Sequence, residues 1–324
     1  MQRIVVFVSN VGNVPSILVR GAITAVESMD NAQLAAICLT DPLNYPAIRR
    51  RYYLRRANRA LRSLVSSDAR MRPRLAEPVD LVRLGRRYGF DLISPDKDDI
   101  NSPAFIRKLR TEIKPTMALS FFCVKRFRDE LLNTFQHAIN YHNGLLPRYK
   151  GLGSTSWSIY RGEAETGFTF HLMTNQLDCG AVLYEESFPI TLGRRVPDLE
   201  IDKARLAAER LPEVLNLAVS GFPGHDQTAE GNYYSRADRD AIKRIANPGD
   251  LSAKELIRRA WAFDGLEMRL NERWYSVSGV VPAPDRALGR NRLCFRTADG
   301  AVMRATRTFY RRIEDALRFS GLLD

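Results

Sequence analysis

The chain has 324 residues, of which 45% are hydrophobic, and its formal net charge is +12. This length and composition suffice for two domains with a full core, and two domains are the better expectation. No stretch is apolar for long enough to cross a membrane, and the four cysteines have neither disulfide nor zinc-ligand spacing. We therefore expect a cytoplasmic protein without a metal site, a disulfide framework or a membrane span.

The positive charge is concentrated in one segment. Between Arg49 and Ala76 there are ten arginines and one acidic residue, Asp68, so this segment supplies +9 of the net charge of +12. Apolar residues recur within it at helical spacing, which predicts an amphipathic basic helix inserted at about residues 45–76. Two interpretations of residues 49–74 stay open: a solvated surface helix, or an electrostatic patch for a phosphorylated partner.

Strand and helix patterns alternate through the first half of the chain. An apolar run at residues 3–9 predicts a strand, a helix pattern follows at 17–26, and residues 32–40 predict a second strand. After the basic segment the predicted order is helix, strand, helix and strand, at residues 80–90, 91–94, 102–113 and 116–123. This alternation predicts an α/β fold with a Rossmann-like, mostly parallel sheet and helices on both faces.

The pattern changes beyond Thr191. A long helix is predicted at residues 198–221, and a polar linker follows at 222–232. Further along, a capped helix and two strands joined around Asp299 predict a small mixed or β-rich domain. The predicted division is a first domain at residues 1–192, a helix and linker at 193–249, and a small C-terminal domain at 250–324.

One short apolar strand pattern ends in two polar side chains, Asn140 and His142, before a turn through Gly144 and Pro147. Residues two apart on a strand point to the same face. The two side chains therefore converge at the carboxyl end of the strand, where open parallel sheets bind their ligands. The competing interpretation is a polar turn with one hydrogen-bonded histidine.

The segment from about residue 117 to residue 190 resembles the 10-formyltetrahydrofolate-dependent formyltransferases, the family of the glycinamide ribonucleotide and methionyl-tRNA formyltransferases. The family pattern is N-x-H, then L-L-P, a glycine, T-G-x-T, and D-x-G further along the chain. The matching positions are Asn140, His142, Leu145, Leu146, Pro147, Gly151, Thr166, Gly167, Thr169, Asp178 and Gly180. Residues 233–245 and 251–263 are similar, less specifically, to the linker and small C-terminal domain of the tRNA enzymes. The resemblance implies that residues 1–192 are a formyltransferase catalytic domain.

The chemistry of formyl transfer suits the three polar residues of this pattern. Attack of an amine on a formyl group places negative charge on an oxygen, and the attacking nitrogen must lose a proton. Asn140 can donate a neutral hydrogen bond to that oxygen, and a protonated His142 can donate a charged one. Asp178 would favour the imidazolium by raising its pKa, and could accept or relay the proton. We predict that these three residues are catalytic; the alternative for Asp178 is a turn-capping role.

The resemblance also implies a slot for the pterin of the cosubstrate, 10-formyltetrahydrofolate. The slot lies against main chain near the strand at 116–123 and the loop before the aspartate. The residues implied to line it are Phe121, Phe122, Val124 and Leu177, each of which could instead be ordinary core packing. His171 matches a histidine of some family members.

A polar turn precedes the first predicted helix and contains Ser9, Asn10, Gly12 and Asn13. It lacks the three-glycine dinucleotide pattern, so a nicotinamide cofactor is not indicated. Backbone N–H groups at such a helix start can bind a phosphate, and the turn resembles the phosphate loop of the glycinamide ribonucleotide enzymes. We predict substrate binding here, with an ordinary strand-to-helix turn as the alternative.

Departures from the family pattern bear on the amine acceptor. The histidine is followed by Asn143-Gly144, and residues 155–163 replace the small residues of the tRNA enzymes. These features resemble the enzymes that formylate nucleotide-linked amino sugars, so a primary amine of such a sugar is the leading hypothesis. The alternatives are a methionyl-tRNA formyltransferase with tRNA as its partner, an enzyme for an amino acid, hydroxylamine or carrier-bound peptide, and a noncatalytic binding protein. The sequence leaves the acceptor and the oligomeric state open.

Overall fold

A computed structural model describes residues 1–9, 12–40, 80–95, 99–191, 194–228, 230–289 and 291–307. The basic helix predicted at residues 45–76 lies outside the described residues. The chain divides into two compact units, one formed by residues 1–150, 167–188 and 200–231, the other by 151–166, 189–199 and the chain from 232 onward. Neither unit is continuous along the chain, since residues 151–166 and 189–199 interrupt the first unit, and the domain limits predicted at 192 and 249 stay predictions.

The first unit is built on a seven-stranded sheet with the strand order β3-β2-β1-β4-β5-β7-β8. The strands are β1 (Gln2–Val8), β2 (Ala32–Leu39), β3 (Asp91–Ile93), β4 (Met117–Phe121), β5 (His137–His142), β7 (Glu165–Leu172) and β8 (Val182–Pro189). Strands β1 to β5 pair in parallel, and β7 runs antiparallel to β5. The predicted mostly parallel sheet is confirmed.

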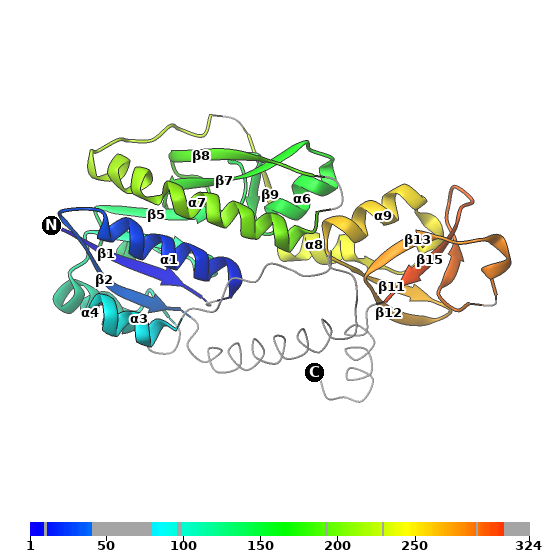
Figure 1. The fold of residues 1–324 in the computed structure, drawn as a ribbon, viewed down its shortest axis with the longest axis horizontal. Coiled ribbons are helices and arrows are strands. Elements are labelled where there is room, and N and C mark those ends of the chain that lie inside the picture. Colours follow the sequence, from blue (N-terminus) through cyan, green and yellow to red (C-terminus); the bar gives the residue numbers. More distant parts are fainter. Residues whose placement is uncertain are drawn as a thin grey trace. The chain divides into compact units, whose positions relative to one another are not determined.

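Helices cover both faces of this sheet. They are α1 (Asn13–Glu27), α3 (Leu81–Tyr88), α4 (Pro103–Lys108), the π-helical turn η4 (Leu109–Ile113), α5 (Asp129–Leu132) and α7 (Val196–Val219). Ile4, Val6 and Val8 of β1 share one core with α1, α3 and α7, and Figure 1 shows α1 and α7 on the same side of the strands. Val5 and Phe7 point into a second core with α4, η4 and α5. Strand β1 is therefore apolar at consecutive positions because both of its faces are buried.

Local capping explains where several helices begin. The side chain of Ser102 accepts a hydrogen bond of 3.3 Å from Phe105 N at the start of α4. Asp80 does the same for Arg83 N at 3.1 Å, and α3 ends at Gly89 with a φ of 72°. These caps fix the two ends of α3, which precedes β3, and the start of α4, which follows it.

The second unit contains two three-stranded sheets, with strand orders β10-β11-β12 and β13-β15-β14. The strands are β10 (Arg244–Ile245), β11 (Leu266–Leu270), β12 (Arg273–Val277), β13 (Gly279–Pro282), β14 (Cys294–Arg296) and β15 (Val302–Thr306). Helices α6 (Ser154–Arg161), α8 (Arg236–Lys243) and α9 (Ala253–Ala262) belong to the same unit, as do the short η5 (Pro248–Asp250), η6 (Asp285–Ala287) and β9 (Asn232–Tyr234).

The predicted strand pair around Asp299 is β14 and β15, which pair antiparallel. A shared core of β11, β13, β15 and α9 side chains confirms a β-rich C-terminal region. Its colours run from yellow to red in Figure 1. No helix within the described ranges is both long and apolar enough to span a membrane.

Candidate active site

Strand β5 carries Asn140 and His142 at its carboxyl end, and its antiparallel neighbour β7 completes the site. Asn140 is paired in register with His171, and His142 with Thr169. The Nδ2 atom of Asn140 lies 3.1 Å from Nε2 of His171. The pairing of β5 with β7 therefore brings a second histidine to the predicted site.

Asp178 joins the two histidines from the loop between β7 and β8. Its Oδ1 atom lies 3.6 Å from Nδ1 of His142 and 3.6 Å from Nε2 of His171. The side chains of His142, His171 and Asp178 are 7%, 3% and 14% exposed. The structure thus brings together the three predicted catalytic residues in one largely buried cluster, with His171 as a fourth member.

The tautomers of both histidines follow from their carbonyl neighbours. Nε2 of His142 lies 2.6 Å from the carbonyl oxygen of Tyr149, and Nδ1 of His171 lies 2.8 Å from that of Leu172. A carbonyl only accepts, so each of these nitrogens carries a proton. In the neutral rings, Nδ1 of His142 then presents its lone pair beside Asp178, and Nε2 of His171 accepts from the amide of Asn140.

Burial lowers the pKa of His142 below its usual value, although Asp178 and the Tyr149 carbonyl raise it. His171 and Lys203 lower it further. The effect of the Asp178 carboxylate on this pKa has the direction expected from the sequence. The net direction is the opposite, because removing the imidazole from water disfavours its charged form more strongly. Burial therefore favours the neutral form of His142.

The loop that carries Asp178 is held by close packing and by one side chain. Asp178 has a φ of 55°, in the left-handed region. A Cβ atom on Gly180 would lie 1.8 Å from the carbonyl oxygen of Leu172, so only glycine fits there. The side-chain amide of Gln227 donates to the carbonyl oxygens of Asp178 at 3.0 Å and of Gly180 at 2.8 Å. Gln227 is a site residue that the sequence analysis missed, since it lies in a polar linker without a periodic pattern.

The T-G-x-T and L-L-P segments of the sequence pattern pack against each other beside His142. The hydroxyl of Thr169 donates to the Gly144 carbonyl at 2.8 Å and accepts from the N–H of Leu146 at 3.1 Å. A Cβ atom on Gly167 would lie 2.5 Å from a side-chain carbon of Leu145. These contacts fix the turn that follows His142.

The four residues predicted for the pterin slot lie in different environments. Val124 and Leu177 are 71% and 50% exposed, whereas Phe121 is fully buried in the core of the sheet. Phe122 is partly buried and has a φ of 53°. The loops of Val124 and Leu177 are joined, because the Arg126 side chain donates to the Asn175 carbonyl. Two exposed apolar side chains thus stand on connected loops, one of which is the Asp178 loop itself.

The N-terminal turn is partly described. The hydroxyl of Ser9 lies 2.9 Å from that of Thr40 and accepts a hydrogen bond of 3.0 Å from Val124 N, so Ser9 joins the ends of β1, β2 and β4. Gly12 precedes α1, and its carbonyl accepts from Ser16 N at 2.9 Å. Asn10 and the side chain of Asn13 lie outside the described residues. Phosphate binding by this turn stays a prediction.

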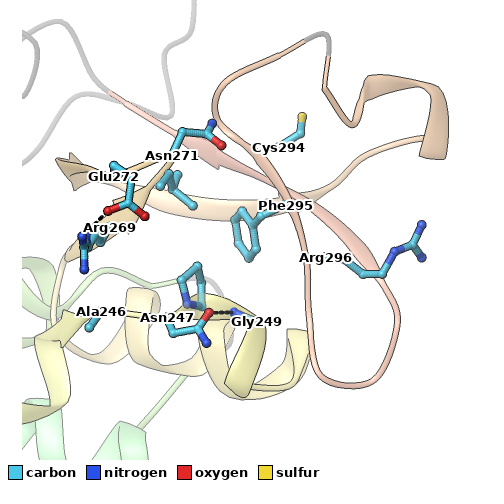
Figure 2. Close-up of a pocket in the computed structure, with 11 residues that line it drawn as sticks. Ala246, Asn247, Gly249, Arg269, Asn271, Glu272, Cys294, Phe295 and Arg296 are labelled. Carbon is cyan, nitrogen blue, oxygen red and sulfur yellow. Dashed lines mark hydrogen bonds and ion pairs between the residues drawn. The ribbon is translucent and has the colours of Figure 1, made fainter.

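Two cavities are lined by none of the four cluster residues. One of about 490 Å³ in the first unit is lined by Leu146, Pro147 and residues of the 182–185 and 225–228 segments, including Gln227. Another, of about 380 Å³, lies in the second unit, and Figure 2 shows the Arg269–Glu272 ion pair and the Asn247–Gly249 hydrogen bond among its lining residues. No predicted site residue lines the second cavity. Within the described residues, no group of histidine, cysteine, aspartate and glutamate side chains could hold a metal ion.

Comparison with known proteins identifies the domain that holds the cluster. Residues 96–215 match the family described as formyl transferase. A GDP-perosamine N-formyltransferase of Brucella melitensis is 37% identical over 99 residues, which are 31% of this chain and 38% of the relative. The match therefore spans less than half of that relative's length.

Two solved structures share the fold. A sugar N-formyltransferase from a Shewanella species has a TM-score of 0.60 at 16% identity, covering 86% of this chain and 98% of that one. An N-formyltransferase from Helicobacter canadensis, in complex with folinic acid and dTDP-3-aminofucose, has a TM-score of 0.56 at 14% identity, covering 95% and 100%. At these identities the likeness establishes the fold alone.

The fold and the cluster define a Rossmann-like protein with a histidine–carboxylate site at the carboxyl ends of its strands. The matched segment contains every member of the cluster. Residues 96–215 therefore match the formyl transferase family, in agreement with the resemblance read from the sequence for this part of the chain.

Proposed function

We propose that this protein is an N-formyltransferase that moves a formyl group from 10-formyltetrahydrofolate to the primary amine of a nucleotide-linked amino sugar. The observation that carries the proposal is the cluster of Asn140, His142, His171 and Asp178 inside a formyl transferase domain. The sugar acceptor is supported by the relatives, which act on GDP-perosamine in Brucella and bind dTDP-3-aminofucose in Helicobacter.

Asn140 would stabilise the oxygen on which negative charge develops. Its amide nitrogen has two N–H groups, one of which is directed to Nε2 of His171 at 3.1 Å. The second can donate to the formyl oxygen. Because His171 holds the amide in one orientation, this donor needs no rearrangement during the reaction, which is the condition for strong electrostatic stabilisation.

His142 would accept the proton that the amine loses, and Asp178 would stabilise the resulting charge. Nδ1 of His142 is unprotonated in the neutral ring and can take up this proton as the new carbon–nitrogen bond forms. Asp178, 3.6 Å away, stabilises the resulting imidazolium. The same Nδ1 atom can return the proton to the nitrogen that gives up the formyl group, so the residues end in their starting state.

The residues present fit a folate cosubstrate. Val124 and Leu177 expose apolar side chains on joined loops beside Asp178, which suits one face of an aromatic ring system. When bound, 10-formyltetrahydrofolate supplies the formyl group.

A tetrahydrofolate-release assay tests the proposal. Purified protein is given 10-formyltetrahydrofolate with GDP- and dTDP-linked amino sugars, charged initiator tRNA, or free amino acids. We expect release that depends on a nucleotide-linked amino sugar. Release only with initiator tRNA would instead support the tRNA hypothesis, and no release with any amine would contradict formyl transfer to these classes.

A further inference from the structure

Lys203 is a charged side chain buried behind the reactive cluster. It lies on α7 and is fully buried, which is exceptional because lysine is almost never buried completely unless it is paired. Its ammonium group donates to the carbonyl oxygens of Asn143 and Gly167, each at 3.1 Å. Asn143 and Gly167 are distant in sequence: Asn143 directly follows β5, and Gly167 lies in β7.

Both carbonyls lie just beyond the point where β5 and β7 separate. The last pair in the register of these strands is His142 with Thr169. Asn143 follows His142 directly, and Gly167 lies two residues before Thr169 in β7. The ammonium of Lys203 thus connects the two strands at the position where the regular pairing has ended. Any shift of Asn143 is transmitted to His142, its covalent neighbour.

A second residue of α7 holds the side chain of Asn143. Glu200, one helical turn before Lys203, accepts a hydrogen bond of 3.2 Å from Asn143 Nδ2. The hydroxyl of Tyr141 donates to Asn143 Oδ1 at 3.1 Å. The residue after His142 is therefore fixed through its carbonyl by Lys203 and through its amide by Glu200 and Tyr141. We propose that Lys203 is a positioning residue for His142, because it holds the backbone directly beside the imidazole. This inference rests on the proposed function.

The charges around His142 act in different directions. Asp178 favours the imidazolium, whereas Lys203 and His171 disfavour it, and burial outweighs each of them. Burial lowers the pKa of Lys203 to about 7, and Glu200 raises it. Since the pKa of His142 lies below its usual value, Lys203 still carries its charge in the range where His142 titrates. A lysine that only filled space would not affect that titration.

Two substitutions separate the effect of the charge of Lys203 from the effect of its hydrogen bonds. Lys203→Met keeps an unbranched chain but removes the charge and the donors, whereas Lys203→Gln removes the charge and keeps N–H donors. Leu211→Ala is the matched control, because Leu211 is fully buried on the same helix and its truncation destabilises the domain without touching Asn143. His142 is titrated by NMR in the folded, ligand-free proteins, and turnover is measured with 10-formyltetrahydrofolate and the acceptor that the wild type uses.

We expect the pKa of His142 to rise in both Lys203 variants and to stay unchanged in Leu211→Ala. Turnover should fall about 10- to 100-fold in Lys203→Met, the scale of a small misplacement of a reacting group, and less in Lys203→Gln. An unchanged His142 titration in the folded variants overturns the proposal, as does failure of both variants to fold, which would assign Lys203 to folding alone. The titration needs no substrate. If the wild type transfers formyl to no acceptor, the proposed function is contradicted, but the titration of His142 still tests the role of Lys203.

Discussion

The carboxylate of Asp178 is the most informative group to neutralise, because it contacts both histidines through one oxygen. Asp178→Asn preserves the shape of the side chain and removes its charge. Unit charges at the observed 3.6 Å interact by about 1 kcal/mol in bulk water and about 5 kcal/mol at an effective dielectric constant of 20. Since the imidazole and the carboxylate are largely buried, we expect a loss of about 3 to 4 kcal/mol, or about 10²- to 10³-fold in turnover.

The assay is steady-state release of tetrahydrofolate, combined with an NMR titration of His142. Because Asp178 raises the pKa of His142, the substitution should lower that pKa further, so the imidazolium becomes harder to form at every pH. Asp226→Asn is the control, since Asp226 is an exposed carboxylate on the segment next to Gln227. Near-normal turnover in Asp178→Asn, on the acceptor that the wild type uses, would refute the assignment of a charged partner to His142.

Three further predictions concern the groups around the cluster. Gln227→Glu keeps the shape but replaces the N–H donors of the Asp178 loop, so turnover should fall about tenfold while folate binding, measured by fluorescence, is retained. Gly180→Ala places a methyl group against the Leu172 carbonyl, and urea unfolding should show a loss of about 1 to 3 kcal/mol. The lowered pKa of Lys203, about 7 in the folded chain, means that the unfolded chain binds more protons between about pH 7 and pH 10. The free energy of unfolding should therefore rise with pH there, by up to about 1.4 kcal/mol per pH unit more than in Lys203→Met.

Each of these predictions has an outcome that contradicts it. Wild-type turnover in Gln227→Glu would show that the Asp178 loop holds its conformation without the amide. A Gly180→Ala protein as stable as the wild type would mean that the backbone at Leu172 can move away. If the free energy of unfolding changes with pH equally in the wild type and in Lys203→Met, Lys203 does not titrate between about pH 7 and pH 10 in the folded chain.

The sequence predicted the parts of the fold that depend on local pattern. The alternation of apolar strands and capped helices gave the parallel sheet, and the two-residue spacing of Asn140 and His142 placed both side chains at the end of β5. Asp178 was located by the family pattern, and it reaches the cluster as expected. These features follow from the periodicity and order of residues along the chain, and both can be read from a single sequence.

The remaining parts of the site depend on contacts between distant segments. His171 enters the cluster only because β7 pairs antiparallel with β5 in one register. Gln227 acts from a linker, and Lys203 is buried although lysine on a helix normally indicates an exposed face. The protonation of His142 was expected from its carboxylate partner, but burial has the larger effect. Burial of a polar group is a property of the packed fold, so the sequence pattern could not supply it.

The central claim is that this site moves a formyl group to the amine of a nucleotide-linked amino sugar. The most direct measurement follows an isotope-labelled formyl group from 10-formyltetrahydrofolate into the acceptor by NMR, with the wild type and with Asp178→Asn. We expect the label to appear as an amide on the sugar nitrogen with the wild type, and far more slowly with the variant. Label that reaches only water as formate, or that reaches the sugar equally fast with both proteins, would contradict the claim.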